Sequence, residues 1–258
     1  MKHLFPISAT ALLLSLSGST AFAAPKKVDT TVLSDDWYTI TLGAGANGKP
    51  YGYYNDHVEI KKGRLFYQNH VWKREEDYIN EEQLGAFAEN SPELIPLFFN
   101  FHSTYRTSET SIDGTVVDGK LLTVRAKQGG SELPIVKKAL TSKTFFSIFF
   151  PYWLKQHLAE LKPGKTLSFR TILEDNIEQG FNTVYGSVKQ EKPDAFAEKS
   201  GTKKFLVDYR SLRSFWWLDA EGTCLRMEMP QQKMLVQKVN KAQAQAFLNG
   251  AQPTTPEE

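Results

Sequence analysis

The fold is decided by the stretch Trp37–Leu42, which reads WYTITL, together with the segment GAGANG at 43–48 and the run YGYYNDHVEI at Tyr51–Ile60. Successive residues of a strand fall on opposite faces, so Tyr38 and Ile40 share one face, as expected of a sheet with one buried side. Asn-Gly at the end of GAGANG favours a tight hairpin, because a type I′ turn needs positive φ at both central residues. We therefore predict two antiparallel strands.

Short β-type runs recur along the rest of the chain, separated by turn signals. Two of these turns are expected at Asp113-Gly114 and Asp118-Gly119. The pattern predicts an antiparallel meander. The further expected strands are Arg64–Lys73, Phe98–Ser111, Gly119–Lys127, Thr166–Glu174, Asn182–Gln190, Lys203–Tyr209, Phe215–Asp219, Thr223–Met229 and Lys233–Val239.

One segment, Pro151–Leu161, breaks the β pattern and stops at the Lys-Pro-Gly of 162–164. Proline suits the first turn of a helix, and Pro-Gly suits its exit. Leu154, Leu158 and Leu161 fall at i, i+4 and i+7, which predicts an apolar stripe that the sheet must cover.

The expected fold is therefore mainly β: a large curled antiparallel sheet, a half-barrel or partial barrel, with one packed α-helix. Strongly twisted open sheets rarely stay flat beyond roughly ten strands, so a sheet of this size must curl or split. We expect a signal peptide at residues 1–23 and a single β-rich domain at 24–250. Residues 251–258 are rich in Pro, Thr and Glu, which predicts a disordered tail.

The first residues predict export. Lys2 precedes an apolar segment, Ala11–Leu16, and Ala21-Phe22-Ala23 has the small-x-small pattern of a signal peptidase site. Spanning a bilayer takes about 20 apolar residues, so we expect no membrane span. No Cys that could be acylated lies near the cleavage site. The protein is expected to be periplasmic or secreted, and soluble after cleavage following Ala23.

Composition limits the partners. Removal of the leader leaves 30 basic and 29 acidic residues, a balance that offers no electrostatic attraction for nucleic acid. A chain with a single Cys forms no internal disulfide, so the fold must be stabilised by core burial.

That single thiol, Cys224, is the one candidate nucleophile. It follows a turn on an expected strand, where it would share a face with Arg226 and Glu228. A reactive thiol needs a nearby His and a helix N-terminus or a cation. The sequence around Cys224 favours a structural, half-buried role.

The histidine and carboxylate residues form no sequence pattern that indicates acid–base catalysis or metal binding. Asp56-His57 suggests half of an acid–base pair, but adjacent residues of a strand point to opposite faces. The charged runs at 73–77 and 81–82 are typical of a solvated loop or helix end. No metal-ligand spacing occurs among the four histidines of the mature chain, and we predict no catalytic residue, metal site or cofactor. These histidines are His57, His70, His102 and His157.

Aromatic residues gather at 98–101, 145–153 and 215–217. Consecutive rings on a strand point to both faces, which is more than one core requires. The surplus is expected to line an apolar cavity, to cover the outer face or to form a partner-binding patch. The candidate ligand-binding residues are Phe146, Phe149, Trp153 and Trp217.

Three motifs in this order resemble a known family: Trp37–Leu42 followed by 48–53, the LxxLKPGK turn at Leu158–Lys165, and WLDAEG at Trp217–Gly222. The region from Trp37 to Val239 is similar to the β-rich N-terminal region of bacterial secreted transglutaminase-like proteins and its stand-alone relatives of unknown function. The resemblance implies a fold and an envelope setting. It carries over no catalytic residue, because the Cys-His-Asp catalytic domain is absent. By architecture alone the expected fold also resembles the half-barrel of periplasmic lipoprotein carriers.

The sequence leads to two main hypotheses for the function of this protein. A third hypothesis is an uncharacterised enzyme. The first is an exported, non-catalytic binding module of the cell envelope that holds an apolar or lipid-like ligand in the curved sheet. The second is an envelope scaffold or accessory protein that binds another exported protein through an aromatic patch. An apolar cavity of roughly 300 Å³ or more favours the first; a filled barrel with a flat external patch favours the second.

The leader makes a direct prediction. Because it ends in Ala21-Phe22-Ala23, the mature N-terminus should be Ala24. N-terminal sequencing or intact-mass measurement of material recovered from the periplasm checks this. An uncleaved cytoplasmic product would contradict the expected location.

Overall fold

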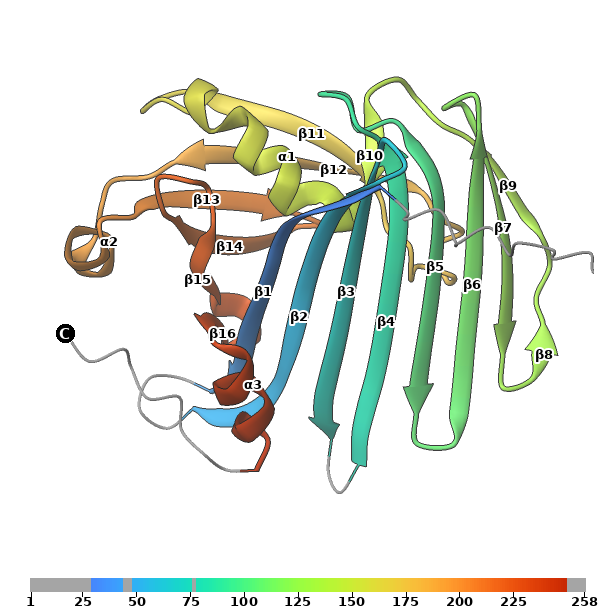
Figure 1. Cartoon of the computed structure of the whole chain (residues 1–258), viewed down its shortest axis with the longest axis horizontal. Coiled ribbons are helices and arrows are strands. Elements are labelled where there is room, and N and C mark those ends of the chain that lie inside the picture. The colour runs from blue at the N-terminus through green and yellow to red at the C-terminus, as the bar shows by residue number, and fades with distance from the viewer. Residues whose placement is uncertain (1–28, 44–47, 76–77, 250–258) are drawn as a thin grey trace, which may run out of the picture.

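The computed structural model describes residues 29–43, 48–75 and 78–249. Sixteen strands form one continuous sheet that curls without closing, and one main helix lies against it (Figure 1). The expected fold class, a mainly β curled sheet with a packed helix, is confirmed. The predicted signal peptide and the predicted tail at 251–258 lie outside the described residues.

The first wall of the sheet is a meander in which successive strands pair antiparallel, with β7 pairing both β8 and β9. Its strands are β1 (Thr30–Leu42), β2 (Lys49–Lys61), β3 (Arg64–Glu75), β4 (Tyr78–Glu89), β5 (Pro96–Tyr105), β6 (Ser108–Val117), β7 (Leu121–Gln128), β8 (Ser131–Glu132) and β9 (Val136–Ala139).

The second wall runs at a steep angle to the first (Figure 1) and joins it where β16 pairs with β1. All pairs of described strands are antiparallel except β10 with β11. Its strands are β10 (Thr144–Phe146), β11 (Thr166–Ile172), β12 (Thr183–Gln190), β13 (Lys203–Tyr209), β14 (Leu212–Leu218), β15 (Cys224–Met229) and β16 (Met234–Val239). The helices are η2 (Ser147–Phe149), α1 (Phe150–His157), η3 (Leu158–Glu160), α2 (Ala195–Ser200), η4 (Pro230–Gln232) and α3 (Lys241–Phe247).

The predicted antiparallel pairing of the first two strands is confirmed, whereas residues 44–47 of the expected turn lie outside the described residues. Tyr38 of β1 lies opposite Tyr54 of β2, and their stacked ring centroids are 4.7 Å apart. Tyr38 and Ile40 are buried, and Thr39 on the other face is buried as well. Helix α3 packs on β1 and β2, with Phe247 fully buried, and so covers the outer face at this point.

Two expectations about the meander are wrong. The charged runs expected in a solvated loop or helix end lie in strands where the structure describes them: residues 73–75 end β3, and residues 81–82 belong to β4. Glu82 pairs with Lys73 of β3 at 2.7 Å, and Glu81 meets His70 of β3 at 2.5 Å. Residues 76 and 77 lie outside the described residues. The expected single strand Phe98–Ser111 is two strands, since a turn with positive φ at Arg106 separates β5 from β6.

Only one of the two expected Asp-Gly turns is a turn. Asp118 and Gly119 both have positive φ, 50° and 62°, and connect β6 to β7. Gly114 instead lies within β6, opposite Phe99 of β5. A Cβ atom at 114 would lie 1.9 Å from the Phe99 ring, so glycine here permits a close approach across the strands.

The predicted helix is confirmed as α1 followed by the single turn η3. Leu154 and Leu161 of the expected stripe are almost fully buried, and Leu158 is partly buried against the core. The helix lies between the two walls (Figure 1). Its end meets the β14–β15 turn, where a Cβ atom at Gly222 would lie 2.8 Å from Leu158.

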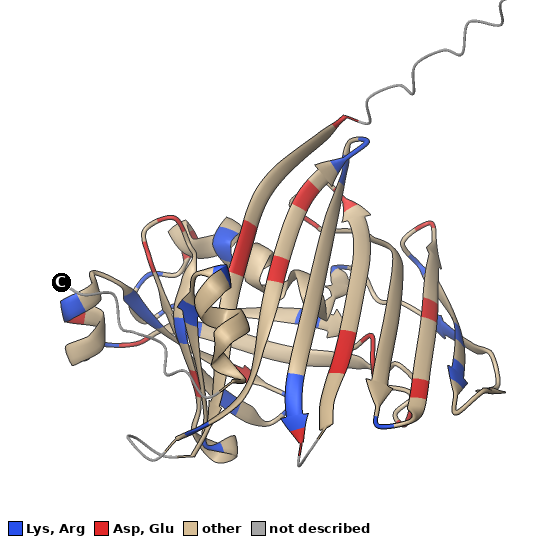
Figure 2. Ribbon diagram, turned by 60° about the horizontal axis from the view of Figure 1, so that its bottom comes forward, with Lys and Arg blue, Asp and Glu red and all other residues tan. Residues whose placement is uncertain are grey.

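Charged residues of both signs are distributed over the strands and connections (Figure 2). Within the described part of the chain, no helix is long and apolar enough to cross a membrane.

The packing of α1 yields a stability prediction. Leu154 is 1 % exposed, so Leu154→Ala should lower the free energy of unfolding by about 2–5 kcal/mol. Gln156 is exposed on the same helix, and Gln156→Ala should change it by less than about 0.5 kcal/mol. Urea unfolding of both variants checks the contrast, and equal small effects would mean that α1 is not docked.

Candidate ligand-binding cavity

A cavity of about 550 Å³ lies on the concave side of the sheet, between strands β1–β4 and strands β13–β16. The start of α1 forms part of its wall through Phe150 and Pro151. The cavity is open to solvent, and most of the side chains that line it are apolar. The apolar wall is formed by Ile40, Val71, Leu84, Ile148, Phe150, Pro151, Trp216, Met227, Met229, Met234 and Val236.

Three of the wall residues are methionines, Met227, Met229 and Met234. They are all the methionines of the chain except Met1. Methionine is unbranched and polarisable, so it adapts to apolar ligands of different shape. Our sequence analysis missed these residues, although their positions in two neighbouring strands were a usable signal.

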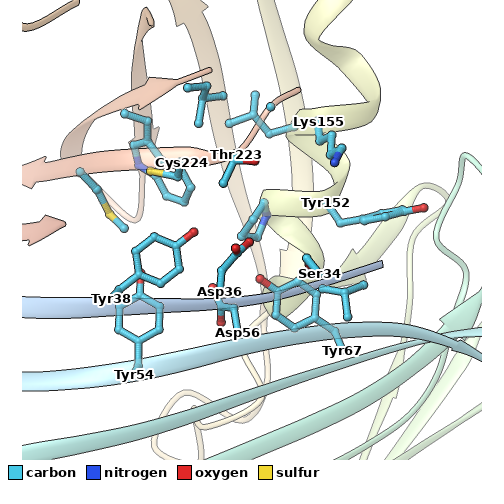
Figure 3. Close-up of a pocket in the computed structure, with 17 residues that line it drawn as sticks. Ser34, Asp36, Tyr38, Tyr54, Asp56, Tyr67, Tyr152, Lys155, Thr223 and Cys224 are labelled. Atoms are coloured by element: carbon cyan, nitrogen blue, oxygen red, sulfur yellow. The ribbon is translucent and has the colours of Figure 1, made fainter. Parts of the chain in front are cut away.

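Polar groups gather at one end of this cavity, where it meets a smaller cavity of about 90 Å³. Asp36, Asp56 and Asn69 lie directly opposite one another on β1, β2 and β3, in one row on the concave face. Asp56 lines both cavities, as do Tyr54 and Tyr67. Figure 3 shows the two aspartates side by side between the Tyr38–Tyr54 pair and Tyr67.

The two aspartates differ in their partners. Asp36 is paired with Lys238 of β16 at 2.8 Å, whereas Asp56 accepts a hydrogen bond from Asn69 at 2.7 Å and one from Tyr67. Desolvation deep in the protein raises the pKa of Asp56 to about 7, against the lowering effect of these hydrogen bonds. The accessible surface that Asp56 keeps faces the cavities.

Cys224 also lines the small cavity. Burial raises the pKa of its thiol to about 12, and the thiol donates to the carbonyl oxygen of Arg226. The prediction that Cys224 shares a face of the strand with Arg226 and Glu228 is wrong. A bulge places Trp217 opposite Arg226 but Leu218 opposite Cys224, which turns the thiol towards the core.

A second buried carboxyl group, Glu174, follows β11. It accepts hydrogen bonds from the Ser147 hydroxyl at 2.5 Å and from the backbone N–H of Ile148 at 3.1 Å, at the start of η2. Burial raises its pKa to about 7. Glu174 therefore anchors the segment that leads into α1.

The Asp56-His57 pair is the histidine feature that the sequence singled out. Asp56 faces the cavities, whereas His57 lies 3.5 Å from Asp35 and from Glu59. The expectation that Asp56 and His57 point to opposite faces is therefore confirmed. In the described ranges, no group of three or more His, Cys, Asp or Glu side chains could hold a metal ion.

The four aromatic residues expected to bind ligand lie elsewhere. Phe146, Phe149 and Trp153 are buried in the core next to the cavity, and none of them contributes to its wall. Trp217 faces the other side of the sheet, where its indole N–H donates to Asp194 at 3.0 Å. Ligand contact by these four residues stays a prediction.

Trp216, the neighbour of Trp217, does line the cavity. Its ring meets Phe150 of α1 edge-on, with centroids 5.3 Å apart. The period-2 rule shows that neighbouring tryptophans face opposite ways, but it does not show which of them faces inwards.

The fold has a counterpart among solved structures. A crystal structure described as a β-barrel-like protein of the domain of unknown function DUF1849, from Brucella abortus, matches with a TM-score of 0.50 and 14% sequence identity. The match covers 79% of this chain and 93% of that chain. A DUF1089 family protein from Pseudomonas aeruginosa matches with a TM-score of 0.40 and 13% identity, over 74% and 95% of the two chains. At such identities the first likeness shows the fold alone.

No family model matches the sequence, and no curated protein does. The two solved structures are not described as transglutaminase-like. The resemblance to transglutaminase-like N-terminal regions stays a prediction.

The burial of Glu174 predicts a pH effect on stability. Its pKa rises on folding from 4.5 to about 7, so the folded state binds the proton more tightly than the unfolded state. The free energy of unfolding should therefore fall as the pH rises from about 4.5 to 7. In Glu174→Gln the decrease in the free energy of unfolding between pH 4.5 and 7 should be smaller than in the wild type by on the order of 2 kcal/mol. Urea unfolding across that pH range measures this difference.

The matched control is Glu178→Gln, which changes an exposed carboxylate nearby. It should leave the pH dependence as in the wild type. An unchanged slope in Glu174→Gln would show that Glu174 is ionised in the folded protein throughout this range.

Proposed function

We propose that this protein is an exported binding protein of the bacterial cell envelope that holds an apolar, lipid-like ligand in its concave cavity. The observation that carries the proposal is the cavity itself, about 550 Å³ with mainly apolar walls. Ligand sites typically have volumes of 300–1,000 Å³, apolar walls and a few convergent polar groups. The cavity meets these criteria, with Tyr54, Asp56 and Asn69 as the polar groups.

The fold supports this function because the residues that pack the core are different from the residues that line the cavity. The rings of Phe146 and Phe149 are fully buried in the core. The flexible side chains of Met227, Met229 and Met234 line the open space. The rigid part of the interior therefore holds the sheet in shape, and the adaptable part can repack around an apolar ligand.

The envelope setting rests on the leader, whose residues predict export. Export and an apolar cavity together fit a protein that shields a lipid-like molecule from water outside the cytoplasm. A free apolar chain in water costs about 0.8 kcal/mol for each exposed CH₂ group.

An envelope scaffold is the second candidate, and a separate surface favours it. Tyr78 and Ile79 at the start of β4 and Tyr105 at the end of β5 are about half exposed. Arg106 lies over the rings of Tyr78 and Tyr105, at 5.1 and 5.8 Å from their centroids. Exposed aromatic and arginine side chains are enriched at protein interfaces.

Binding of diphenylhexatriene, an uncharged apolar fluorophore, tests the first function. The wild type should bind one molecule and enhance its fluorescence. Val71→Trp should weaken binding at least about tenfold, because the larger ring fills space in the cavity that Val71 lines. Val117→Trp is the control, since Val117 is 54% exposed.

Native mass spectrometry of the purified protein would in addition give the mass of any ligand retained from the cell. Failure of the wild type to bind the fluorophore, or equal binding by Val71→Trp, would refute the apolar-ligand function and favour the scaffold.

A further inference from the structure

The junction of the two cavities holds a carboxyl group without a cation. Asp56 lines the apolar cavity and the smaller one beside it, and it lies between Asp36 and Asn69 in the row across β1–β3. In the described part of the chain, no Lys, Arg or His forms an ion pair with Asp56. Asp56 is therefore accessible from the apolar cavity.

The charged groups around the junction come from several elements. On β1, Asp36 is neutralised by Lys238 of β16. On β3, Lys73 is neutralised by Glu82 of β4, with both carboxylate oxygens within 2.8 Å. Lys155 of α1 lines the small cavity but is exposed. Ionised Asp56 therefore adds an uncompensated negative charge to the end of the cavity.

The other titratable groups at the junction carry no charge near neutral pH. Burial raises the pKa of each of the tyrosines Tyr38, Tyr54 and Tyr67 well above its ordinary value. The thiol of Cys224 is held protonated in the same way. These groups can accept or donate hydrogen bonds, but they supply no positive charge to Asp56.

This arrangement discriminates between the polar ends that an apolar ligand can carry. A carboxylate or phosphate would be repelled by ionised Asp56, whose charge, unlike that of Asp36, is not neutralised by a lysine. A hydroxyl group could donate a hydrogen bond to Asp56, but it brings no positive charge to neutralise the carboxylate. A protonated amine supplies the missing cation and donates charge-assisted hydrogen bonds, which are roughly twice as strong.

We propose that Asp56 binds the protonated amine of an amphiphilic ligand whose apolar chain occupies the large cavity. The proposal rests on the apolar-ligand function above and specifies the class of its ligand. The small cavity beside Asp36 and Tyr152 provides room for the head group. Binding of the amine stabilises ionised Asp56, so a protein whose Asp56 is protonated releases that proton on binding.

Displacement of diphenylhexatriene by three single-chain compounds of equal length tests the proposal. Dodecylamine, dodecanol and dodecanoate are compared at pH 7, below the concentrations at which they aggregate. Dodecylamine should displace the fluorophore at a concentration about tenfold lower than dodecanol, and dodecanoate should be the weakest. Asp56→Asn should bind the amine no better than the alcohol.

The control is Asp35→Asn, which removes the same charge one residue away from Asp36 on β1. The Asp35 side chain is 54% exposed and bonds to Asn55 and His57 rather than to the cavity groups. This variant should keep the preference for the amine. A preference that survives in Asp56→Asn, or is absent in the wild type, would overturn the assignment.

A second measurement needs no variant. Calorimetric titration of the wild type with dodecylamine, in two buffers of different ionisation enthalpy, should show proton release at pH 6.5 and none at pH 8.5. Dodecanol should release none at either pH. Proton release that persists unchanged at pH 8.5, or that equals the release with dodecanol, would overturn the role of Asp56.

The outcomes separate this proposal from the function on which it rests. If the fluorophore and dodecanol bind but the amine has no advantage, the apolar-ligand function stands and the amine assignment fails. If neither the fluorophore nor dodecanol binds, the apolar-ligand function itself fails.

Discussion

The curl of the sheet depends on aromatic rings that join its free edge to the opposite wall. β10 pairs through its backbone only with β11, yet Phe146 of β10 meets Phe99 of β5 edge-to-face, with centroids 5.1 Å apart. Phe149, just after β10, meets Tyr67 of β3 in the same way at 5.9 Å. A closed barrel would need a continuous hydrogen-bond ladder. Here side-chain packing takes the place of that ladder, and Gly114 makes it possible by leaving room for Phe99.

This mode of closure also explains why open space remains inside. Rings hold the edge against the first wall, so the interior near Phe146 and Phe149 is full. The remaining wall carries Met227, Met229 and Met234, whose flexible chains do not define a single packing. The cavity therefore lies in the part of the interior that the aromatic rings do not fill.

Structure that is set by residues adjacent in the sequence could be predicted, whereas structure that depends on the register of pairing between strands could not. Local signals worked where the described residues test them: the Asp118-Gly119 turn was predicted because both of its residues favour positive φ. The antiparallel pairing of β1 with β2 was predicted as well. The β5–β6 turn was missed since its positive-φ residue, Arg106, gives no such signal. The inward-facing residues of β15 could not be derived, because a bulge in this strand, opposite Trp217 and Leu218 of β14, reverses its alternation. Within β14 the alternation is regular, with Trp216 and Leu218 lining the cavities and Trp217 on the other side of the sheet.

Two carboxyl groups with a raised pKa, the half-buried Asp56 and the fully buried Glu174, differ in the reason for their position. Both are raised to a pKa of about 7 by burial, so both cost stability when they ionise. Glu174 has a structural reason to be there, because it caps η2 through Ser147 and Ile148. Asp56 caps no helix, and its hydrogen bonds come only from side chains. An asparagine could accept the same bonds at no electrostatic cost, so the carboxyl group is better explained by a ligand that needs its charge.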